Sequence, residues 1–355
     1  MRIIITAGGT GGHIYPALAV LETIKKDKEN KFLYIGTKDR MENELVPSLN
    51  IPYESLEIYG LSKDVLNNIK NVTCILKSIK KAKKIIKEFK PDAVIAFGGY
   101  VTLPVILAAK KLNVKTYLHE QNYIPGKVNK YLSRYATAIF TSFEETRKYF
   151  KDKNIIYTGN PCGERAKNIK AIDKEKLGFT KSKKLILIVM GSMGSSVVND
   201  KLINFLQTYE DPDKEILFIT GKKLYEDFNK IKVPKSTIIK PYVDNLPGLM
   251  KQADLIISRA GASTISEILA LDIPSILIPS PYVANNHQYY NALDLQKRGV
   301  SLMLEQDKLD ADTLKKYIKS ILDDKKTYIA YKNKLKNITK LDSSTKIYKY
   351  IKDNK

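Results

Sequence analysis

The chain has 355 residues, 43% of them hydrophobic, and a formal net charge of +22. This length suits two domains, and the apolar fraction is that of a globular protein. The longest apolar run, Leu185–Met190, is too short to span a bilayer. An apolar strand follows Met1 and Arg2 directly, so we expect no signal peptide. The two cysteines provide neither a disulfide framework nor a metal set, which favours a reducing cytoplasm.

The first predicted strand, residues 3–7, ends in a glycine-rich turn. The turn reads Gly8-Gly9-Thr10-Gly11-Gly12-His13 and is followed by a helical pattern. Glycines allow positive φ and close approach to an anion, and a helix start carries partial positive charge. The turn lacks the third glycine of the dinucleotide fingerprint. We therefore favour a nucleotide or pyrophosphate site over a turn that only packs a helix onto a strand.

Residues 75–90 are predicted to form a basic amphipathic helix with an apolar stripe beside many lysines. These lysines are Lys77, Lys80, Lys81, Lys83, Lys84, Lys87 and Lys90. Such a helix can lie on an anionic bilayer surface. An ordinary surface helix with solvated lysines is the alternative, and the pattern alone slightly favours it.

Two further strand ends in the first half carry polar or flexible residues. The strand over residues 93–97 ends in Gly98-Gly99-Tyr100, and the strand over residues 116–118 ends in His119-Glu120-Gln121-Asn122. Four consecutive polar side chains at a strand end can form a hydrogen-bonding rim. A polar loop without function is an equal alternative.

The second half repeats this plan. Apolar strands over residues 185–190 and 255–258 end in turns at residues 191–196 and 259–262, and helical patterns follow. Continuous apolar strands that alternate with helices indicate parallel sheets covered on both faces. We therefore predict two Rossmann-like domains that join near residues 158–161. Ligands bind such sheets at the carboxyl ends of their strands, so we expect a cleft faced by the turns of both domains.

Three polar groups of the second half are candidate ligand contacts. Glu267 falls in the first turns of a helix, where it can act on the helix dipole, accept ribose hydroxyls, or both. The segment 285–292 is rich in amides, which suit sugar hydroxyls. Asp211-Pro212-Asp213 resembles a metal-binding D-x-D motif but lies in a polar loop.

The chain has only three histidines, His13, His119 and His287, and each lies beside a predicted strand end. A lone histidine is more often structural, but three in such places favour a function for at least one. His13 adjoins the first glycine turn and is the strongest candidate for a general base.

These motifs occur in order and together resemble the MurG family of bacterial N-acetylglucosaminyltransferases, part of glycosyltransferase family 28. The resemblance runs from residue 2 to about residue 340. It implies an α/β fold of GT-B architecture, with two Rossmann-like doubly wound parallel sheets. The implied domains are residues 1–162 for the acceptor and membrane, residues 163–340 for the donor, and a helical tail at 341–355.

The resemblance also implies the reaction and its setting. An inverting transfer moves N-acetylglucosamine from UDP-N-acetylglucosamine to the C4 hydroxyl of the muramoyl sugar in undecaprenyl-pyrophosphoryl-MurNAc-pentapeptide (lipid I), giving lipid II. No cofactor, catalytic metal or nucleic-acid partner is expected. The protein is expected to lie peripherally on the anionic cytoplasmic face of the cell membrane.

Residue roles follow from the same resemblance. His13 would be the base or position the acceptor, Glu267 would bind ribose, and Val243 would offer its backbone to the uracil. The other implied contacts, to the sugar, phosphates or ribose of the donor, are Thr10, Gly11, Gly12, Asn122, Arg165, Ser192, Ala262, Ser263, Thr264, Ile265, Ser266 and Gln288. The family's arginine after Asn-Pro-x is replaced by Gly163, and Arg165 is expected to substitute for it through a shifted loop.

Three other functions share parts of this pattern. Another GT-B enzyme, such as one that glycosylates diacylglycerol, would have a similar donor half. A nicotinamide-dependent dehydrogenase shares the first strand, turn and helix, but predicts one cofactor fingerprint rather than two matched halves. A nucleic-acid-binding protein would account for the positive charge.

Overall fold

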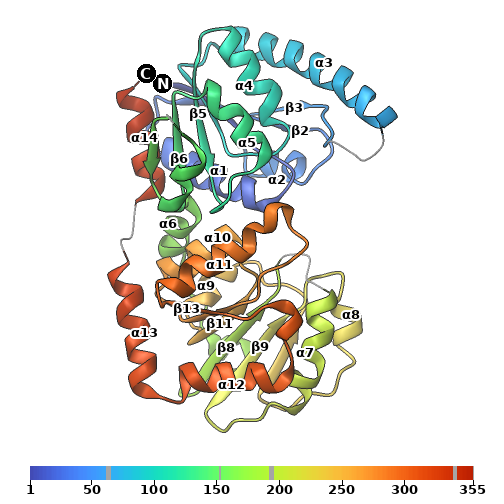
Figure 1. Ribbon diagram of the computed structural model, residues 1–355, viewed down its shortest axis with the longest axis vertical. Helices are drawn as coiled ribbons and strands as arrows, with labels where there is room; N and C mark the ends of the chain where they lie inside the picture. Colours follow the sequence, from blue (N-terminus) through green and yellow to red (C-terminus); the bar gives the residue numbers. More distant parts are fainter. Residues whose placement is uncertain (61–64, 152, 192–195, 339–341, 355) are drawn as a thin grey trace. The chain divides into compact units, whose positions relative to one another are not determined.

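The computed structural model describes residues 1–60, 65–151, 153–191, 196–338 and 342–354. The chain forms two compact units. Unit 1 comprises Met1–Glu164 and Leu341–Lys355, and unit 2 comprises Arg165–Lys340. Each unit is built around its own parallel sheet, in agreement with the predicted α/β fold of two Rossmann-like domains (Figure 1).

Unit 1 contains a seven-stranded sheet in the order β3-β2-β1-β4-β5-β6-β7. The strands are β1 (Arg2–Thr6), β2 (Lys31–Thr37), β3 (Tyr53–Leu56), β4 (Ala93–Ala96), β5 (Lys115–Glu120), β6 (Ala138–Thr141) and β7 (Ile155–Tyr157). The helices are α1 (Gly11–Ile24), α2 (Glu42–Ser48), α3 (Val65–Phe89), α4 (Thr102–Lys111), α5 (Lys127–Leu132) and α14 (Ser343–Asp353). The boundary between the units falls within α6 (Pro161–Asn168). Short 3-10 helices span Ser133–Tyr135 and Glu144–Tyr149.

Side chains that alternate along β1 explain why both faces of this sheet are covered. Ile3 and Ile5 pack in one core cluster with residues of α1 and α14, whereas Ile4 packs in another with residues of α3 and α4. All three isoleucines are fully buried. A strand buried on both sides reads as a continuous apolar run, which is why the sequence indicated a parallel sheet.

Helix α14 belongs to unit 1, although 178 residues separate Glu164 from its first residue, Ser343. It packs on α1, and the Tyr350 ring lies 5.6 Å from that of Phe140. The side-chain amide of Asn30 donates to the Tyr348 hydroxyl at 2.7 Å. The segment treated as a tail in the sequence therefore contributes a helix to the core of unit 1.

Unit 2 contains a six-stranded sheet in the order β10-β9-β8-β11-β12-β13. The strands are β8 (Lys184–Val189), β9 (Lys214–Ile219), β10 (Thr237–Lys240), β11 (Leu255–Ser258), β12 (Ser275–Leu277) and β13 (Ser301–Met303). The helices are α7 (Ser196–Thr208), α8 (Tyr225–Phe228), α9 (Leu246–Met250), α10 (Ala262–Ala270), α11 (His287–Lys297), α12 (Ala311–Leu322) and α13 (Lys325–Asn337). Short 3-10 helices span Lys174–Leu177, Ala284–Asn286 and Gln306–Lys308.

One core cluster of unit 2 lies between the sheet and helices α7 and α12, which also pack on each other. Ile186 and Ile188 of β8 are fully buried there, with Phe205 of α7 and Ile318 of α12. The order of strands reverses at β1 and β4 in unit 1 and at β8 and β11 in unit 2. Open parallel sheets bind ligands at the carboxyl edge beside such a reversal, which directs attention to the turns after these four strands.

Candidate active site

The first glycine turn of unit 1 lies at the reversal point between β1 and β4. Thr6 of β1 pairs with Ala96 of β4, and the Gly8 amide donates to the Gly98 carbonyl at 3.2 Å. Gly99 has a φ of +88°, and a Cβ atom there would collide with the Gly8 backbone. Glycine is required at this contact because only it allows the two turns to approach each other.

His13 stands at the first turn of helix α1 and is partly exposed. Its Nδ1 lies 3.1 Å from the Gly8 carbonyl oxygen and 3.4 Å from the Thr10 hydroxyl. A carbonyl oxygen only accepts, so Nδ1 carries the hydrogen and the lone pair is on Nε2. This tautomer suits a general base that works through Nε2. Gly11 and Gly12 begin the same helix, where backbone amides have no partner within the helix.

His119, Glu120 and Gln121 at the end of β5 are buried. The His119 Nε2 donates to the Gly159 carbonyl at 3.1 Å, and its Nδ1 lies 3.1 Å from the Gln121 amide nitrogen. Burial lowers the pKa of His119 to about 4, so the ring is neutral at physiological pH. His119 therefore has a structural role, because both of its ring nitrogens contact buried groups of the protein.

Glu120 holds the loop that carries Asn122. Its carboxylate accepts the Asn122 amide at 3.0 Å, the Gly126 amide at 3.1 Å and the Asn129 side chain at 2.9 Å. Burial raises the pKa of Glu120, and these hydrogen bonds oppose the shift. Asn122 itself is partly exposed at the carboxyl edge of the sheet. The polar run therefore has buried supports and one residue able to meet a ligand.

The corresponding turns of unit 2 follow β8 and β11. Val189 pairs with Ser258, so both turns begin at the same level of the sheet. Gly191 has a φ of +93°, the left-handed region that favours glycine. Ser192, the expected diphosphate contact, lies outside the described residues.

Helix α10 begins directly after the second of these turns and contains the segment 262–267. The buried hydroxyl of Ser263 has no hydrogen-bond partner in the described part of the chain, which suits a group that faces a ligand. Burial raises the pKa of Glu267 to about 7, and the charge of Arg165 opposes the shift. Arg165 on α6 thus acts electrostatically on Glu267.

The remaining predicted contacts lie on loops of unit 2. Val243 follows β10 and is partly exposed. Gln288 begins α11, and its side-chain oxygen accepts the Ser280 amide at 2.9 Å. His287 lies 2.9 Å from the Ala284 carbonyl through Nδ1, and burial lowers its pKa. The backbone before this helix is left-handed at Asn285 and Asn286.

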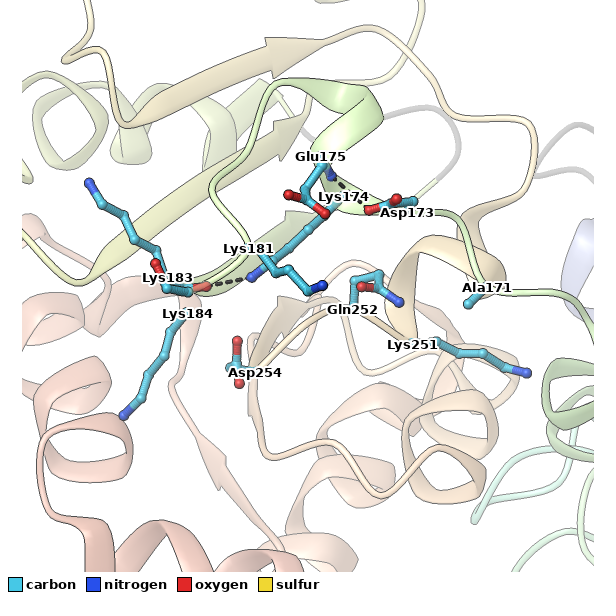
Figure 2. A pocket seen from close by; sticks show the side chains of 11 residues that line it. Ala171, Asp173, Lys174, Glu175, Lys181, Lys183, Lys184, Lys251, Gln252 and Asp254 are labelled. Carbon is cyan, nitrogen blue, oxygen red and sulfur yellow. Dashed lines mark hydrogen bonds between the residues drawn. The ribbon is translucent and has the colours of Figure 1, made fainter.

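A cavity of about 550 Å³ opens at the opposite, amino edge of the same sheet (Figure 2). Lys184 begins β8 and Asp254 precedes β11, and both line it. The ammonium of Lys174 donates to the Lys183 carbonyl, whereas the Lys184 side chain points away from the cavity (Figure 2). The cavity is excluded as the diphosphate site because it lies at the amino edge of the sheet and is lined by both lysines and acidic residues. Asp211–Asp213 also precedes a strand, β9, at that edge.

Two functionally placed residues were missed in the sequence. Arg259 is buried and donates to the Ile278 carbonyl at 3.2 Å and to the Gln306 side chain at 2.7 Å, so it braces the turn after β11. Glu42 accepts the Gly9 amide at 3.2 Å and thus occupies one amide of the first glycine turn. No local motif marks Glu42, because its contact depends on the pairing of β1 with β2.

Two Rossmann-like parallel sheets in one chain, each with turns at its reversal point, agree with the predicted GT-B architecture. The family profiles agree: the glycosyltransferase family 28 N-terminal domain matches residues 3–141, and the family 28 C-terminal domain matches residues 185–349. The chain belongs to glycosyltransferase family 28. This membership excludes the dehydrogenase, and the relatives below confirm the predicted resemblance to the MurG family.

Individual relatives cover the whole chain. The UDP-N-acetylglucosamine–N-acetylmuramyl-(pentapeptide) pyrophosphoryl-undecaprenol N-acetylglucosamine transferase 1 of Bacillus cereus is 40% identical over 98% of both chains. Bacillus licheniformis has a transferase of the same name, without the numeral, that is 38% identical over 100% of this chain and 99% of its own. The crystal structure of Acinetobacter baumannii MurG is 27% identical with a TM-score of 0.80 and covers 99% of both chains.

Metal and membrane features complete the description. Within the described ranges, no three His, Cys, Asp or Glu side chains gather into a possible metal site. No helix there is long and apolar enough to cross a bilayer.

Proposed function

We propose that this protein transfers N-acetylglucosamine from UDP-N-acetylglucosamine to the C4 hydroxyl of the muramoyl sugar of lipid I, giving lipid II. The observation that carries the proposal is 40% identity, over 98% of both chains, to the Bacillus cereus transferase named for this donor and acceptor. The turns at the reversal points of both sheets support it, since a sugar nucleotide and a polar acceptor each need such a site.

Donor binding is assigned to unit 2. The start of α10 and the Gly191 turn support a diphosphate site, because helix starts and left-handed turns direct amides at anions. Glu267 accepts the ribose hydroxyls and Val243 offers its backbone to the uracil. The other donor contacts we propose in unit 2 are Arg165, Ser192, Ala262, Ser263, Thr264, Ile265, Ser266 and Gln288, and Asn122 is the contact we propose from unit 1.

The chemical step is a single displacement with inversion. The C4 hydroxyl oxygen of the acceptor attacks the anomeric carbon, the bond from that carbon to UDP breaks, and the electron pair leaves with UDP. Backbone amides and the α10 start stabilise the charge that develops on the diphosphate. His13 Nε2 takes the hydroxyl proton, which contributes roughly 10²–10⁴ in rate. Thr10, Gly11 and Gly12 lie near the donor sugar and pyrophosphate in this proposal.

The acceptor is bound to a lipid, and helix α3 supports attachment to an anionic membrane. Val72 and Leu76 are 53% and 62% exposed, and Lys77, Lys80 and Lys87 are exposed on the same helix. Apolar side chains beside lysines suit the headgroup region, where each lysine adds about 1 kcal/mol of attraction. We propose a peripheral location on the cytoplasmic face of the cell membrane, with no nucleic-acid partner.

A parallel acceptor assay tests the proposal. Purified full-length protein is given UDP-N-acetylglucosamine labelled in the sugar, together with either a lipid I analogue or diacylglycerol. We expect label in the lipid I analogue alone, with inverted configuration at the new bond. Transfer to diacylglycerol with none to the lipid I analogue would overturn the proposal.

A further inference from the structure

Glu42 is a fully buried acidic residue at the start of α2, beside the first glycine turn. Its carboxyl group accepts the Thr37 hydroxyl at 2.7 Å, the Thr37 amide at 3.0 Å and the Gly9 amide at 3.2 Å. All three partners are neutral donors. Three donors around one carboxyl group stabilise its ionised form.

The surrounding backbone leaves room for this carboxylate. A Cβ atom on Gly8 would collide with the Glu42 Oε1 atom, and one on Gly36 would lie 2.8 Å from its Cγ atom. Gly8 has an ordinary φ, so its lack of a side chain serves this contact rather than a turn. The two glycines therefore provide the space that the Glu42 side chain occupies beside the turn.

One peptide group connects Glu42 to His13. The Gly9 amide that donates to Glu42 and the Gly8 carbonyl that accepts from His13 Nδ1 belong to the same peptide. A hydrogen bond at one end of an amide strengthens the bond at its other end. The imidazole is also confined from another side, because a Cβ on Gly98 would lie 2.8 Å from its Cδ2.

We propose that Glu42 is a positioning residue that orients His13 and supports its positive charge through the Gly8–Gly9 peptide. The inference rests on the proposed role of His13 as general base. When Nε2 takes the acceptor's proton, the imidazolium gains from a carbonyl polarised by the carboxylate. The arrangement does through a peptide what a carboxylate does directly for the histidine of a hydrolase triad.

Two tyrosines lie beside Glu42 and stay neutral. Burial, and after it the charge of Glu42, raises the pKa of both Tyr34 and Tyr53, so both remain neutral. Asp39 acts on Tyr53, Tyr15 lies against Gly11, and His119 of the neighbouring β5 is neutral. Glu42 is therefore the charge whose removal His13 should sense.

The test is a titration of the histidine side chains by NMR in the full chain. Only three histidines are present, so each is assigned by its own substitution. In Glu42→Gln we expect the pKa of His13 to fall by about half a pH unit or more, because the imidazolium loses support. The Gly9 amide proton should move upfield as its acceptor loses charge. Glu44→Gln, an exposed change of equal charge on the same helix, should leave both signals unchanged.

Kinetics provide the second readout. Glu42→Gln should lower kcat about tenfold with little change in the KM for UDP-N-acetylglucosamine, and should move the acid limb of the pH profile to lower pH. Glu42→Asp keeps the charge but shortens its reach, so its effects should be intermediate. If Glu42→Gln does not fold, the Asp variant tests the contact instead, because its shorter side chain withdraws the carboxylate from the Gly9 amide.

The outcomes separate the inference from the proposed function. A folded Glu42 variant with an unaltered His13 pKa and Gly9 signal would overturn the inference, whatever its activity. Full activity in His13→Asn would overturn the base role, and the inference that rests on it would fail as a statement about catalysis. A shifted His13 pKa together with an inactive His13→Asn supports both.

Discussion

Glu267 should make donor binding depend on pH near neutrality. Its pKa is raised from 4.5 to about 7, mainly by burial, so in the free protein it is about half ionised at pH 7. Ribose hydroxyls donate hydrogen bonds, which the ionised carboxylate accepts better than the protonated acid. Binding of UDP-N-acetylglucosamine should therefore favour the ionised form and release a proton.

The size of the effect follows from the ionised fraction. At pH 6 about one-eleventh of Glu267 is ionised, against about half at pH 7. If the donor binds only the ionised form, its apparent Kd rises about fivefold from pH 7 to pH 6 and falls about twofold from pH 7 to pH 8. Proton release at pH 7 should be about half a proton per donor bound.

Calorimetry with UDP-N-acetylglucosamine measures both quantities, with two buffers of different ionisation enthalpy at each pH. Both phosphates of this ligand are diesterified and do not titrate in the range. Glu267→Gln should bind UDP-N-acetylglucosamine more weakly, and its apparent Kd should not change with pH. Glu210 is exposed before β9 at the opposite edge of the sheet, so Glu210→Gln should behave as the parent. A parent protein without the slope, or a Gln variant that keeps it, would refute the reasoning.

Three further predictions concern stability, catalysis and membrane binding. The raised pKa of Glu267 adds to the free energy of unfolding below pH 4.5, and this contribution is lost as pH rises through 7. Between pH 4 and pH 8 the stability of Glu267→Gln, measured by urea unfolding, should therefore rise by about 1–3 kcal/mol relative to that of the parent. No relative gain would contradict the buried state of the carboxyl. His13→Asn should lower kcat about 10²–10⁴-fold while the donor KM changes little, measured by steady-state kinetics; unchanged turnover would remove His13 from the mechanism. Replacing four lysines of α3 with glutamine should reduce sedimentation of the protein with anionic vesicles, the four being Lys80, Lys81, Lys83 and Lys84. The control variant replaces four lysines of unit 2, Lys315, Lys316, Lys319 and Lys325, and should sediment like the parent. Equal binding by both variants would show that α3 is only a solvated surface.

Much of the fold was predictable because buried parallel strands are continuous apolar runs. Residues 3–6, 185–189 and 255–258 each lie within an apolar segment that ends in small or glycine residues, and each became a strand at a reversal point. The repeated order of strand, turn and helix then indicated two sheets. Strand order and the role of α14 depend on contacts between distant segments, which periodicity does not contain.

The candidate site was less accessible from sequence. His119 and His13 have the same side chain, but only their surroundings in the fold distinguish them. His119 is buried and neutral, whereas His13 is partly exposed. Glu42 contacts Gly9 across 33 positions, and only the pairing of β1 with β2 brings them together. Arg165 was expected to act from a shifted loop, but it lies on helix α6 and its charge reaches Glu267 from there.

The most direct measurement is a crystal structure of the protein with bound UDP-N-acetylglucosamine. The assignment of the donor to unit 2 predicts a diphosphate at the turn after β8 and the start of α10, with the ribose hydroxyls on Glu267. In the proposal the first glycine turn of unit 1 meets only the sugar and pyrophosphate, so we expect no uridine there. A nucleotide bound with its uridine on the Gly8–Gly12 turn would contradict the account.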